Sequence, residues 1–146
     1  METSHTKEDA IVESLRGSGF RVTRGRVALL HLLKKARKPL SIQDIVRTSR
    51  GKTMDQATIY RTLSDLANAG IVHRMDLNTG TAHFEYTPDR PHHHHLVCTD
   101  CGVIEDIEDC AIEKLEKNVA RNSKQFTNIY SHNLEFFGHC KKCPAA

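Results

Sequence analysis

Apolar side chains recur every third or fourth residue through the first part of the chain, a spacing that predicts amphipathic helices. One helix is expected over residues 7–16, where the tripeptide GSG stops it. A second is expected to begin after Thr23, whose hydroxyl can cap a helix N-terminus. Ser41 followed by Asp44 resembles a capping box and predicts the start of a short third helix.

The helix with the clearest start and stop signals lies in the segment DQATIYRTLSDLANAGIV. Asp55 is a natural N-cap, and Gly70 supplies the left-handed residue that commonly follows a helix. The stripe predicted to be buried consists of Ile59, Leu63, Leu66 and Ala67. Thr58, Tyr60 and Arg61 remain on or near the open face of this helix.

A hairpin and a linker follow. Residues 71–76 and 81–87 predict two strands around the turn sequence LNTG. Helices followed by a capped helix and a hairpin are the order of a winged helix-turn-helix, which we expect over residues 1–87. Two prolines in TPDRP predict a hinge over residues 88–91.

The remaining residues, 92–146, are predicted to form a second domain of the α+β class. Strands are expected over 92–99, 126–130 and 132–137. Asp109 could cap a helix that carries Ile112, Leu115 and Val119. The whole chain is therefore predicted to be an α+β protein of two domains.

The composition is that of a globular protein, with 38% hydrophobic and 27% charged residues. No apolar run approaches the roughly 20 residues that span a bilayer, and the first residues are too polar for a signal peptide. We therefore expect a cytoplasmic protein without a membrane partner. In a reducing cytoplasm, the five cysteines are better explained as metal ligands or catalytic thiols than as disulfides.

Charge is distributed unevenly along the chain. Residues 1–87 carry 14 Lys and Arg against 9 Asp and Glu, whereas residues 88–146 carry 7 against 9. A basic first half favours a polyanion as partner, with phosphates as targets, although most charge runs are ordinary solvated faces. The basic residues are Arg21, Arg24, Arg26, Lys34, Lys35, Arg37, Lys38, Arg47, Arg50 and Lys52. Tyr60 and Arg61 are better placed for base edges.

Four of the cysteines form two Cys-x-x-Cys pairs, Cys98 with Cys101 and Cys140 with Cys143. Two such pairs in a short domain predict one tetrahedral zinc site of four thiolates, which is closed and stabilises folding. The alternative is two reversible disulfides with a redox role. Cys110 is left over and is expected to be a buried thiol.

Four consecutive histidines, residues 92–95, precede the first cysteine pair. If the segment is extended, His92 and His94 point to one side and His93 and His95 to the other, so one strand could serve two metal sites. The alternative is a solvated loop. Further candidate ligands are His73, His83, Glu85, Glu105, Asp106, Glu108, Glu113, His132 and His139.

With these residues assembled, the chain resembles the ferric uptake regulator (Fur) family of metal-dependent transcriptional repressors. The resemblance is most specific in ATIYRTLSDLANAGIV, HHHHLVCTDCG and FFGHCKKC. It implies a homodimer whose second domain pairs the chains, and a double-stranded DNA operator with an inverted repeat. It implies structural zinc at the four paired cysteines.

The resemblance also implies roles for individual residues. A regulatory site is implied at Glu85, His93, His95 and Asp106, and an additional metal site at His92, His94, Glu113 and His132. Contacts to DNA are expected from Arg21, Thr58, Tyr60 and Arg61. Where iron- and peroxide-responsive members usually have a histidine, this chain has Lys38. His73 lies where zinc-responsive members tend to place a ligand, and we add it to the regulatory site.

The expected function is a metal-responsive repressor that controls metal-ion homeostasis and is not an enzyme. Iron is the first expectation for the regulatory ion and zinc the next, with manganese also compatible. A peroxide- or manganese-responsive regulator of the same family is an alternative. Alternatives of another class are a zinc-dependent hydrolase, which would need an open coordination position and a general base, or a zinc-binding adaptor. No small-molecule substrate is expected.

Overall fold

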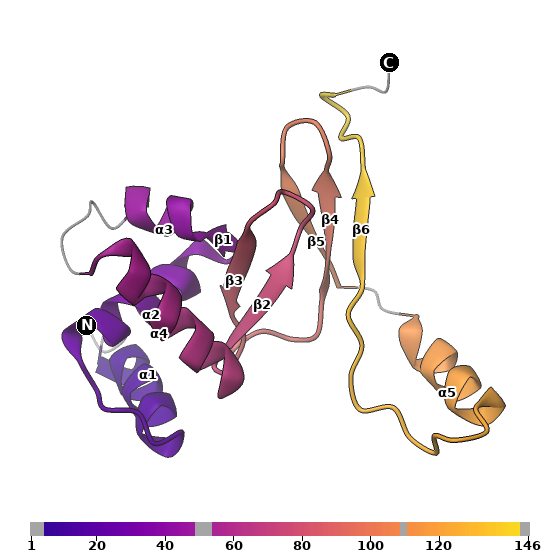
Figure 1. Ribbon diagram of the computed structural model, residues 1–146, viewed down its shortest axis with the longest axis horizontal. Coiled ribbons are helices and arrows are strands. Elements are labelled where there is room, and N and C mark those ends of the chain that lie inside the picture. The colour runs from indigo at the N-terminus through magenta and orange to yellow at the C-terminus, as the bar shows by residue number, and fades with distance from the viewer. Residues whose placement is uncertain (1–4, 49–53, 109–110, 144–146) are drawn as a thin grey trace. The chain divides into compact units, whose positions relative to one another are not determined.

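The computed structural model describes residues 5–48, 54–108 and 111–143 (Figure 1). The chain divides into two compact units, Met1–Asp89 and Arg90–Ala146. Arg50, Lys52, Asp109 and Cys110, for which the sequence predicts roles, lie outside the described residues. Within the described ranges, no helix combines the length and the apolar character that a membrane span requires.

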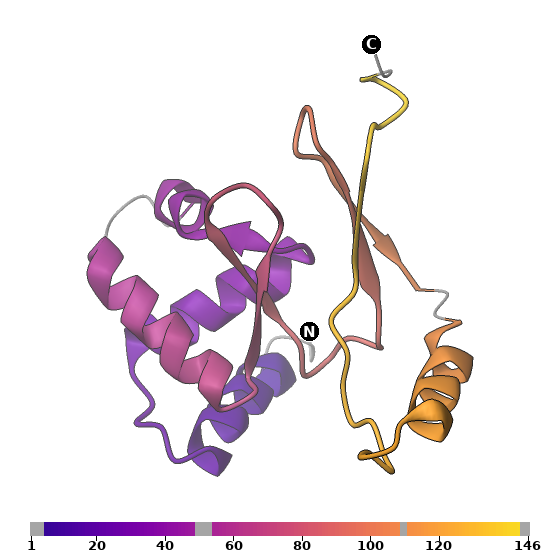
Figure 2. The ribbon, with the colours of Figure 1, turned by 45° about the vertical axis from the view of Figure 1, so that its right-hand side comes forward.

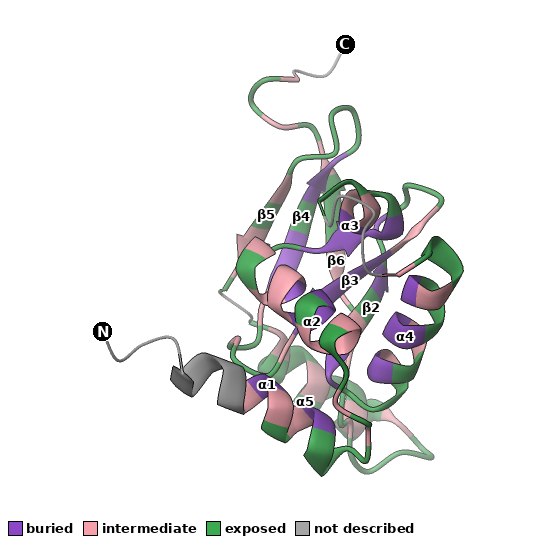
Figure 3. Ribbon diagram, turned by 90° about the vertical axis from the view of Figure 1, so that its left-hand side faces the viewer, coloured by how far each residue is buried: buried purple, intermediate pink, exposed green. Residues whose placement is uncertain are grey.

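The described residues of the first unit contain four helices, as the apolar spacing predicts. They are α1 (His5–Gly17), α2 (Arg24–Ala36), α3 (Ile42–Thr48) and α4 (Gln56–Asn68). Figure 3 shows that the buried residues of α4 lie along one side of the helix, as in an amphipathic helix. The helix boundaries follow the capping signals in the sequence.

Four polar side chains accept hydrogen bonds from amides at the starts of these helices. The hydroxyl of Thr23 accepts a hydrogen bond of 3.3 Å from an amide in the first turn of α2. Before α3, the amide of Asp44 donates to Ser41 Oγ and the amide of Ser41 donates to Asp44 Oδ2, both at 3.1 Å. Asp55 accepts from the amide of Thr58 at 2.9 Å at the start of α4. Each bond satisfies an amide that would otherwise have no partner within its helix.

A three-stranded sheet completes this unit. Its strands are β1 (Leu40–Ser41), β2 (Val72–Asp76) and β3 (Ala82–Tyr86), in the order β1-β3-β2 and antiparallel throughout. The hairpin of β2 and β3 is the predicted wing. The sequence pattern misses β1, because two residues are too few to show alternation.

The hydrophobic core of the first unit joins all four helices to the sheet. Its buried members are Ile11, Leu15, Leu29, Leu30, Leu33, Leu40, Ile42, Ile45, Ile59, Leu63, Leu66, Ile71, Val72, Phe84 and Tyr86. These include the stripe predicted for α4, apart from Ala67, which is only partly buried. The core holds α4 with its opposite face, which carries Tyr60 and Arg61, exposed.

The part of the second unit that the structure describes has a smaller sheet and one helix. Its elements are β4 (His94–Cys98), β5 (Ile104–Ile107), α5 (Ile112–Asn122) and β6 (Glu135–Gly138). The strand order is β5-β4-β6, with β4 antiparallel to β5 and parallel to β6. Figure 2 shows α5 standing beside the sheet, joined to β6 by an extended segment. The α+β class predicted from the sequence is confirmed.

Two strand predictions for this unit are wrong. Residues 126–130 form no strand, and the last strand spans Glu135–Gly138 instead of 132–137. An apolar, β-prone segment becomes a strand only where a neighbour supplies ladder hydrogen bonds, and β4 already has β5 and β6 on its two sides. The sequence pattern also missed β5, whose IEDI segment is too short and too acidic to stand out.

Candidate metal centres and DNA-reading surface

The paired cysteines gather at one end of the second sheet. Cys98 ends β4, and Cys140 and Cys143 follow β6, whose parallel pairing sets Cys98 opposite Gly138. The four Sγ atoms lie within 4.8 Å of one another, and those of Cys101 and Cys140 are 3.7 Å apart. A tetrahedral Zn–S₄ site with bonds of about 2.3 Å requires sulfurs about 3.8 Å apart. The four thiols, which form no disulfide, therefore fit a tetrahedral ion.

Backbone amides favour the thiolate form of one of these cysteines, Cys98. Amides of Cys101, Cys140 and Asp100 point at Cys98 Sγ and lower the pKa of Cys98 to about 6. The amide of Cys140 is 3.3 Å from that sulfur. Cys143 behaves in the opposite way, because hydrogen bonds with the thiols of Cys101 and Cys140 raise its pKa to about 12. A divalent cation would supply the charge that lets all four ionise.

His139, a candidate ligand next to Cys140 in the sequence, has another partner. Its Nδ1 lies 2.9 Å from Oδ2 of Asp100, which lies between the first two cysteines. This contact ties the two cysteine turns together.

The histidine run alternates as an extended segment should. The rings of His92, His94 and His132 lie close together. One ring nitrogen from each of them lies within 4.8 Å of the other two. Nε2 of His94 is 3.1 Å from Nε2 of His92 and 3.3 Å from Nε2 of His132. Imidazoles that share a tetrahedral ion at about 2.1 Å place their nitrogens about 3.4 Å apart. This triad therefore fits one divalent ion.

The protonation of His94 suits a ligand. Burial lowers its pKa, which favours the neutral ring that can bind a metal. Its Nδ1 lies 3.1 Å from the carbonyl oxygen of Leu134, to which an Nδ1–H can donate. That hydrogen bond puts the lone pair on Nε2, the atom that faces the other two histidines.

The carboxylate beside this triad is not the expected one. Oε1 of Glu116 is 2.6 Å from Nδ1 of His132. Glu113, for which the resemblance implies a ligand role, lies in the first turn of α5 and is exposed. The structure does not group Glu113 with the three histidines among the described residues.

His93 and His95 lie on the other side of β4, with ring centroids 4.9 Å apart. His95 is buried, and its Nδ1 is 3.1 Å from Oε2 of Glu135 on β6. Its Nε2 faces Asp106, directly opposite on β5, at 3.9 Å from Oδ1. Asp106 also forms an ion pair with Arg90. Three of the residues expected at the regulatory site, His93, His95 and Asp106, thus lie at or beside β4 and β5 of the second unit.

The other expected regulatory residues lie in the wing. His73 on β2 and Glu85 on β3 are directly opposite each other in the antiparallel pair, so their side chains leave the same face of the hairpin. His83, also a candidate ligand, is buried with Nδ1 3.1 Å from the carbonyl oxygen of Thr81. The wing therefore presents an imidazole and a carboxylate side by side.

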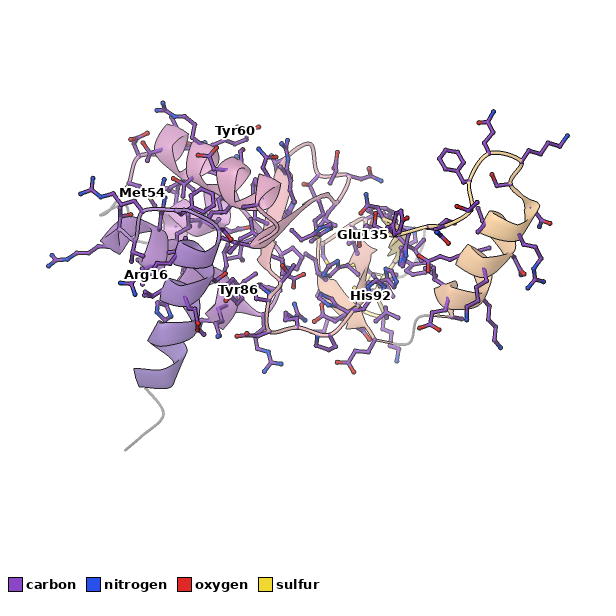
Figure 4. The ribbon with its side chains drawn as sticks, turned by 90° about the horizontal axis from the view of Figure 1, so that it is seen from below. Arg16, Met54, Tyr60, Tyr86, His92 and Glu135 are labelled. Carbon is purple, nitrogen blue, oxygen red and sulfur yellow. The ribbon has the colours of Figure 1, made fainter. Side chains whose placement is uncertain are left out.

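The open face of α4 carries the residues expected to read bases. Tyr60 is 43% exposed and projects from the outer side of α4, while His92 and Glu135 lie at the second sheet (Figure 4). Arg74 on β2 holds its guanidinium 5.9 Å from the centre of the Tyr60 ring. Arg61 and Arg21 are exposed. Thr58, also expected at this surface, bonds Asp55 through its hydroxyl at 2.6 Å and so supports the cap of α4.

A family model described as the ferric uptake regulator family matches residues 17–137. The chain belongs to the ferric uptake regulator family. The Ferric uptake regulation protein of Cupriavidus metallidurans is 34% identical over 135 residues, which cover 89% of this chain and 92% of the relative.

Solved Fur structures resemble the chain over both units. The Francisella tularensis protein with iron is 31% identical, with a TM-score of 0.72, over 86% of this chain and 95% of that chain. The Pseudomonas aeruginosa protein with manganese is 32% identical, with a TM-score of 0.72, over 90% of this chain and 98% of that chain. As a Fur family member, the chain is a metal-responsive transcription regulator.

Four charged residues at these sites were not foreseen from the sequence of this Fur family member. They are Arg74, Arg90, Glu116 and Glu135. Glu135 reaches His95 only because β4 and β6 pair in parallel across 40 residues of sequence. Glu116 could have been proposed from the sequence, because it lies three residues after the candidate ligand Glu113 and therefore on the same side of α5.

Proposed function

We propose that this Fur family protein is a cytoplasmic repressor that binds an inverted-repeat DNA operator as a homodimer when its regulatory metal site is filled. One observation carries the proposal. Immediately after the linker, β4 and the residues before it hold His93 and His95 on one side and His92 and His94 on the other. One strand can therefore supply ligands to two ions, and we assign the pair His93 and His95 to an ion shared with the wing.

Each half of the proposed regulatory site would be assembled within its own unit. His73 and Glu85 are cross-strand neighbours in the wing, and Asp106 is the cross-strand neighbour of His95 in the second sheet. An ion that takes ligands from both halves would fix the orientation of the two units. Without it the linker samples many orientations, and the apparent operator affinity falls with the competent fraction. By linkage, operator DNA would tighten metal binding equally.

Nitrogen and oxygen ligands without thiolate suit Fe²⁺, Mn²⁺ and Zn²⁺. The relative solved with iron supports iron as the regulatory ion, and the relative solved with manganese supports manganese as another candidate. Zinc is a further candidate because it suits the same ligands. For the cysteine site we propose structural Zn²⁺, since four thiolates at tetrahedral spacing favour it over the harder ions. Control of metal-ion homeostasis follows from a DNA affinity that tracks the metal concentration.

Unpartnered apolar side chains support the homodimer. No residue of α5 is buried, although Leu115 and Val119 share one side of the helix at 58% and 50% exposure. Phe126, Tyr130 and Phe136 are also exposed. Monomeric proteins rarely leave so many large apolar groups in water, and a small unit with few buried apolar residues gains most by pairing. A second copy of this chain would cover these groups.

For DNA we propose that the two α4 helices of the dimer enter successive major grooves about 34 Å apart, as in other helix-turn-helix dimers. Tyr60 and Arg61 would contact base edges, and Arg21 the backbone nearby. The exposed positions of all three support these roles.

The test begins with a duplex selected from a random-sequence pool by the protein with Mn²⁺. Anisotropy is then measured with metal-free protein, with Mn²⁺ and with anaerobic Fe²⁺. We expect metal to tighten binding of wild type and not of His95→Ala. DNA affinity that ignores metal would contradict the proposal. Ester or phosphoester hydrolysis without DNA retention would indicate a zinc hydrolase, and the absence of both activities would indicate an adaptor.

A further inference from the structure

Two charged residues of the linker, Asp89 and Arg90, are consecutive and each pairs with a residue of its own unit. Asp89 pairs with Lys34 on α2, and Arg90 pairs with Asp106 on β5. The first pair involves no proposed metal ligand. The second involves a carboxylate that the proposed regulatory site requires. Arg90 and the metal ion would therefore compete for the same group.

Asp106 faces Arg90 and His95 with different oxygens. Its Oδ2 contacts the Arg90 guanidinium, and its Oδ1 lies 3.9 Å from Nε2 of His95, its cross-strand neighbour. Two ligands of one ion with bonds of about 2.1 Å lie about 3.0 to 4.2 Å apart, from adjacent to opposite positions. Asp106 is therefore close enough to share an ion with His95 while Arg90 holds its other oxygen.

Burial makes the Arg90 contact stronger than an ordinary surface pair. The side chains of Arg90 and Asp106 are 16% and 29% exposed, so water screens their attraction incompletely. Arginine stays charged at any physiological pH, so deprotonation of Arg90 cannot release Asp106 for metal binding. The ion must displace the guanidinium.

We infer that Arg90 is a built-in competitor of the regulatory metal ion: it neutralises Asp106 in the metal-free protein, lowers the metal affinity of the site and leaves Asp106 when the ion binds. The inference rests on the proposed function and adds the residue that sets the metal concentration at which the regulator responds. A positioning role would have the opposite sign, because an arginine that only held Asp106 in place would raise the metal affinity.

The experiment measures Mn²⁺ binding directly, from the electron paramagnetic resonance of free Mn²⁺, with full-length protein that retains its cysteine-bound zinc. Arg90→Gln should bind Mn²⁺ about three- to tenfold more tightly than wild type, the range expected for removing a partly buried pair. Arg90→Lys keeps the charge and should remain near wild type. Lys34→Gln, which removes the neighbouring Lys34–Asp89 pair, is the matched control and should leave the affinity unchanged.

A second background shows whether Arg90 acts through Asp106. In Asp106→Asn protein, Arg90→Gln should have no effect on Mn²⁺ affinity. Weaker binding by Arg90→Gln, or tightening that persists in the Asp106→Asn background, would overturn the inference. Failure of the proposed function is distinguishable, because a wild-type Mn²⁺ stoichiometry in His95→Ala would remove the regulatory site itself, whatever Arg90 does.

Discussion

The sulfur atoms of Cys101 and Cys140 lie 3.7 Å apart although the residues belong to different cysteine pairs. The contact exists because β4 and β6, which end beside these pairs, run in parallel in one sheet. Closure of the cysteine cluster and formation of this sheet therefore bring the same two segments of the chain together. Metal binding and folding of the second unit should be coupled in the same way.

Replacing Cys98 by Ser should release the structural ion and unfold the second unit, because a structural site with three thiolates loses most of its binding free energy. Zinc content by mass spectrometry and hydrogen exchange over residues 94–138 would follow both effects. Amides of α2 and α4 should stay protected, since their core is separate. Cys110→Ser, outside the two pairs, is the control. A folded, zinc-containing Cys98→Ser protein would contradict the four-cysteine site.

Replacing Arg61 by Ala should weaken operator binding by about 1–3 kcal/mol and relax base preference, as expected for a residue that reads a base edge. Binding curves at several salt concentrations separate base from phosphate contacts, because each lost phosphate contact reduces the salt slope by about one. We expect Arg61→Ala to reduce the preference for the operator sequence while leaving the salt slope almost unchanged. An unchanged ranking of operator variants would remove Arg61 from the reading surface.

Arg74 should support the same surface through the ring of Tyr60. Its guanidinium lies 5.9 Å from the ring centre, a contact worth roughly 0.5–1 kcal/mol where exposed. Arg74→Gln should therefore weaken operator binding, and much less so in a Tyr60→Leu background that lacks the ring. Equal losses in both backgrounds would show that Arg74 contacts DNA independently.

The first unit follows closely from the sequence, and the second does not. In the first, Thr23, Ser41 and Asp55 cap the helices that local signals predict, because each signal acts within one turn of helix. In the second, Glu135 meets His95 through a parallel pairing of distant strands, which no local pattern specifies. The two Cys-x-x-Cys spacings and the histidine alternation were readable because they depend only on local geometry. The carboxylates around them depend on tertiary contacts.

Glu116 and Glu113 are the two carboxylates that could support metal binding at the histidine triad, and only tertiary contacts distinguish them. Glu116 contacts His132 at 2.6 Å, so Glu116→Gln should weaken metal binding at the histidine triad about 10- to 100-fold, as expected for a carboxylate that orients a ligating histidine. Glu113→Gln, one turn earlier on α5, is the matched control and should have a smaller effect. Zn²⁺ titration monitored by imidazole resonances of His92 and His132 would measure both. The reverse order would show that Glu113 is the ligand implied by the family resemblance.

The capping box before α3 should give the first unit a pH-dependent stability. Hydrogen bonds from the hydroxyl and amide of Ser41 lower the pKa of Asp44 below its usual 3.8, against the opposing effect of burial. Because the folded pKa is the lower one, the stabilisation is fully present above the usual pKa of aspartate and is lost as the pH falls through the folded value. Ser41→Ala should therefore destabilise α3 by about 1 kcal/mol near pH 7, a typical cost for a lost cap, and by less in acid.

Hydrogen exchange of α3 amides in full-length protein between pH 7 and pH 3, with rates corrected for intrinsic exchange, isolates this helix from any unfolding of the second unit. Asp44→Asn cannot ionise and should show a flat profile in the same range, so a pH dependence equal to wild type in that variant would assign the effect to another group.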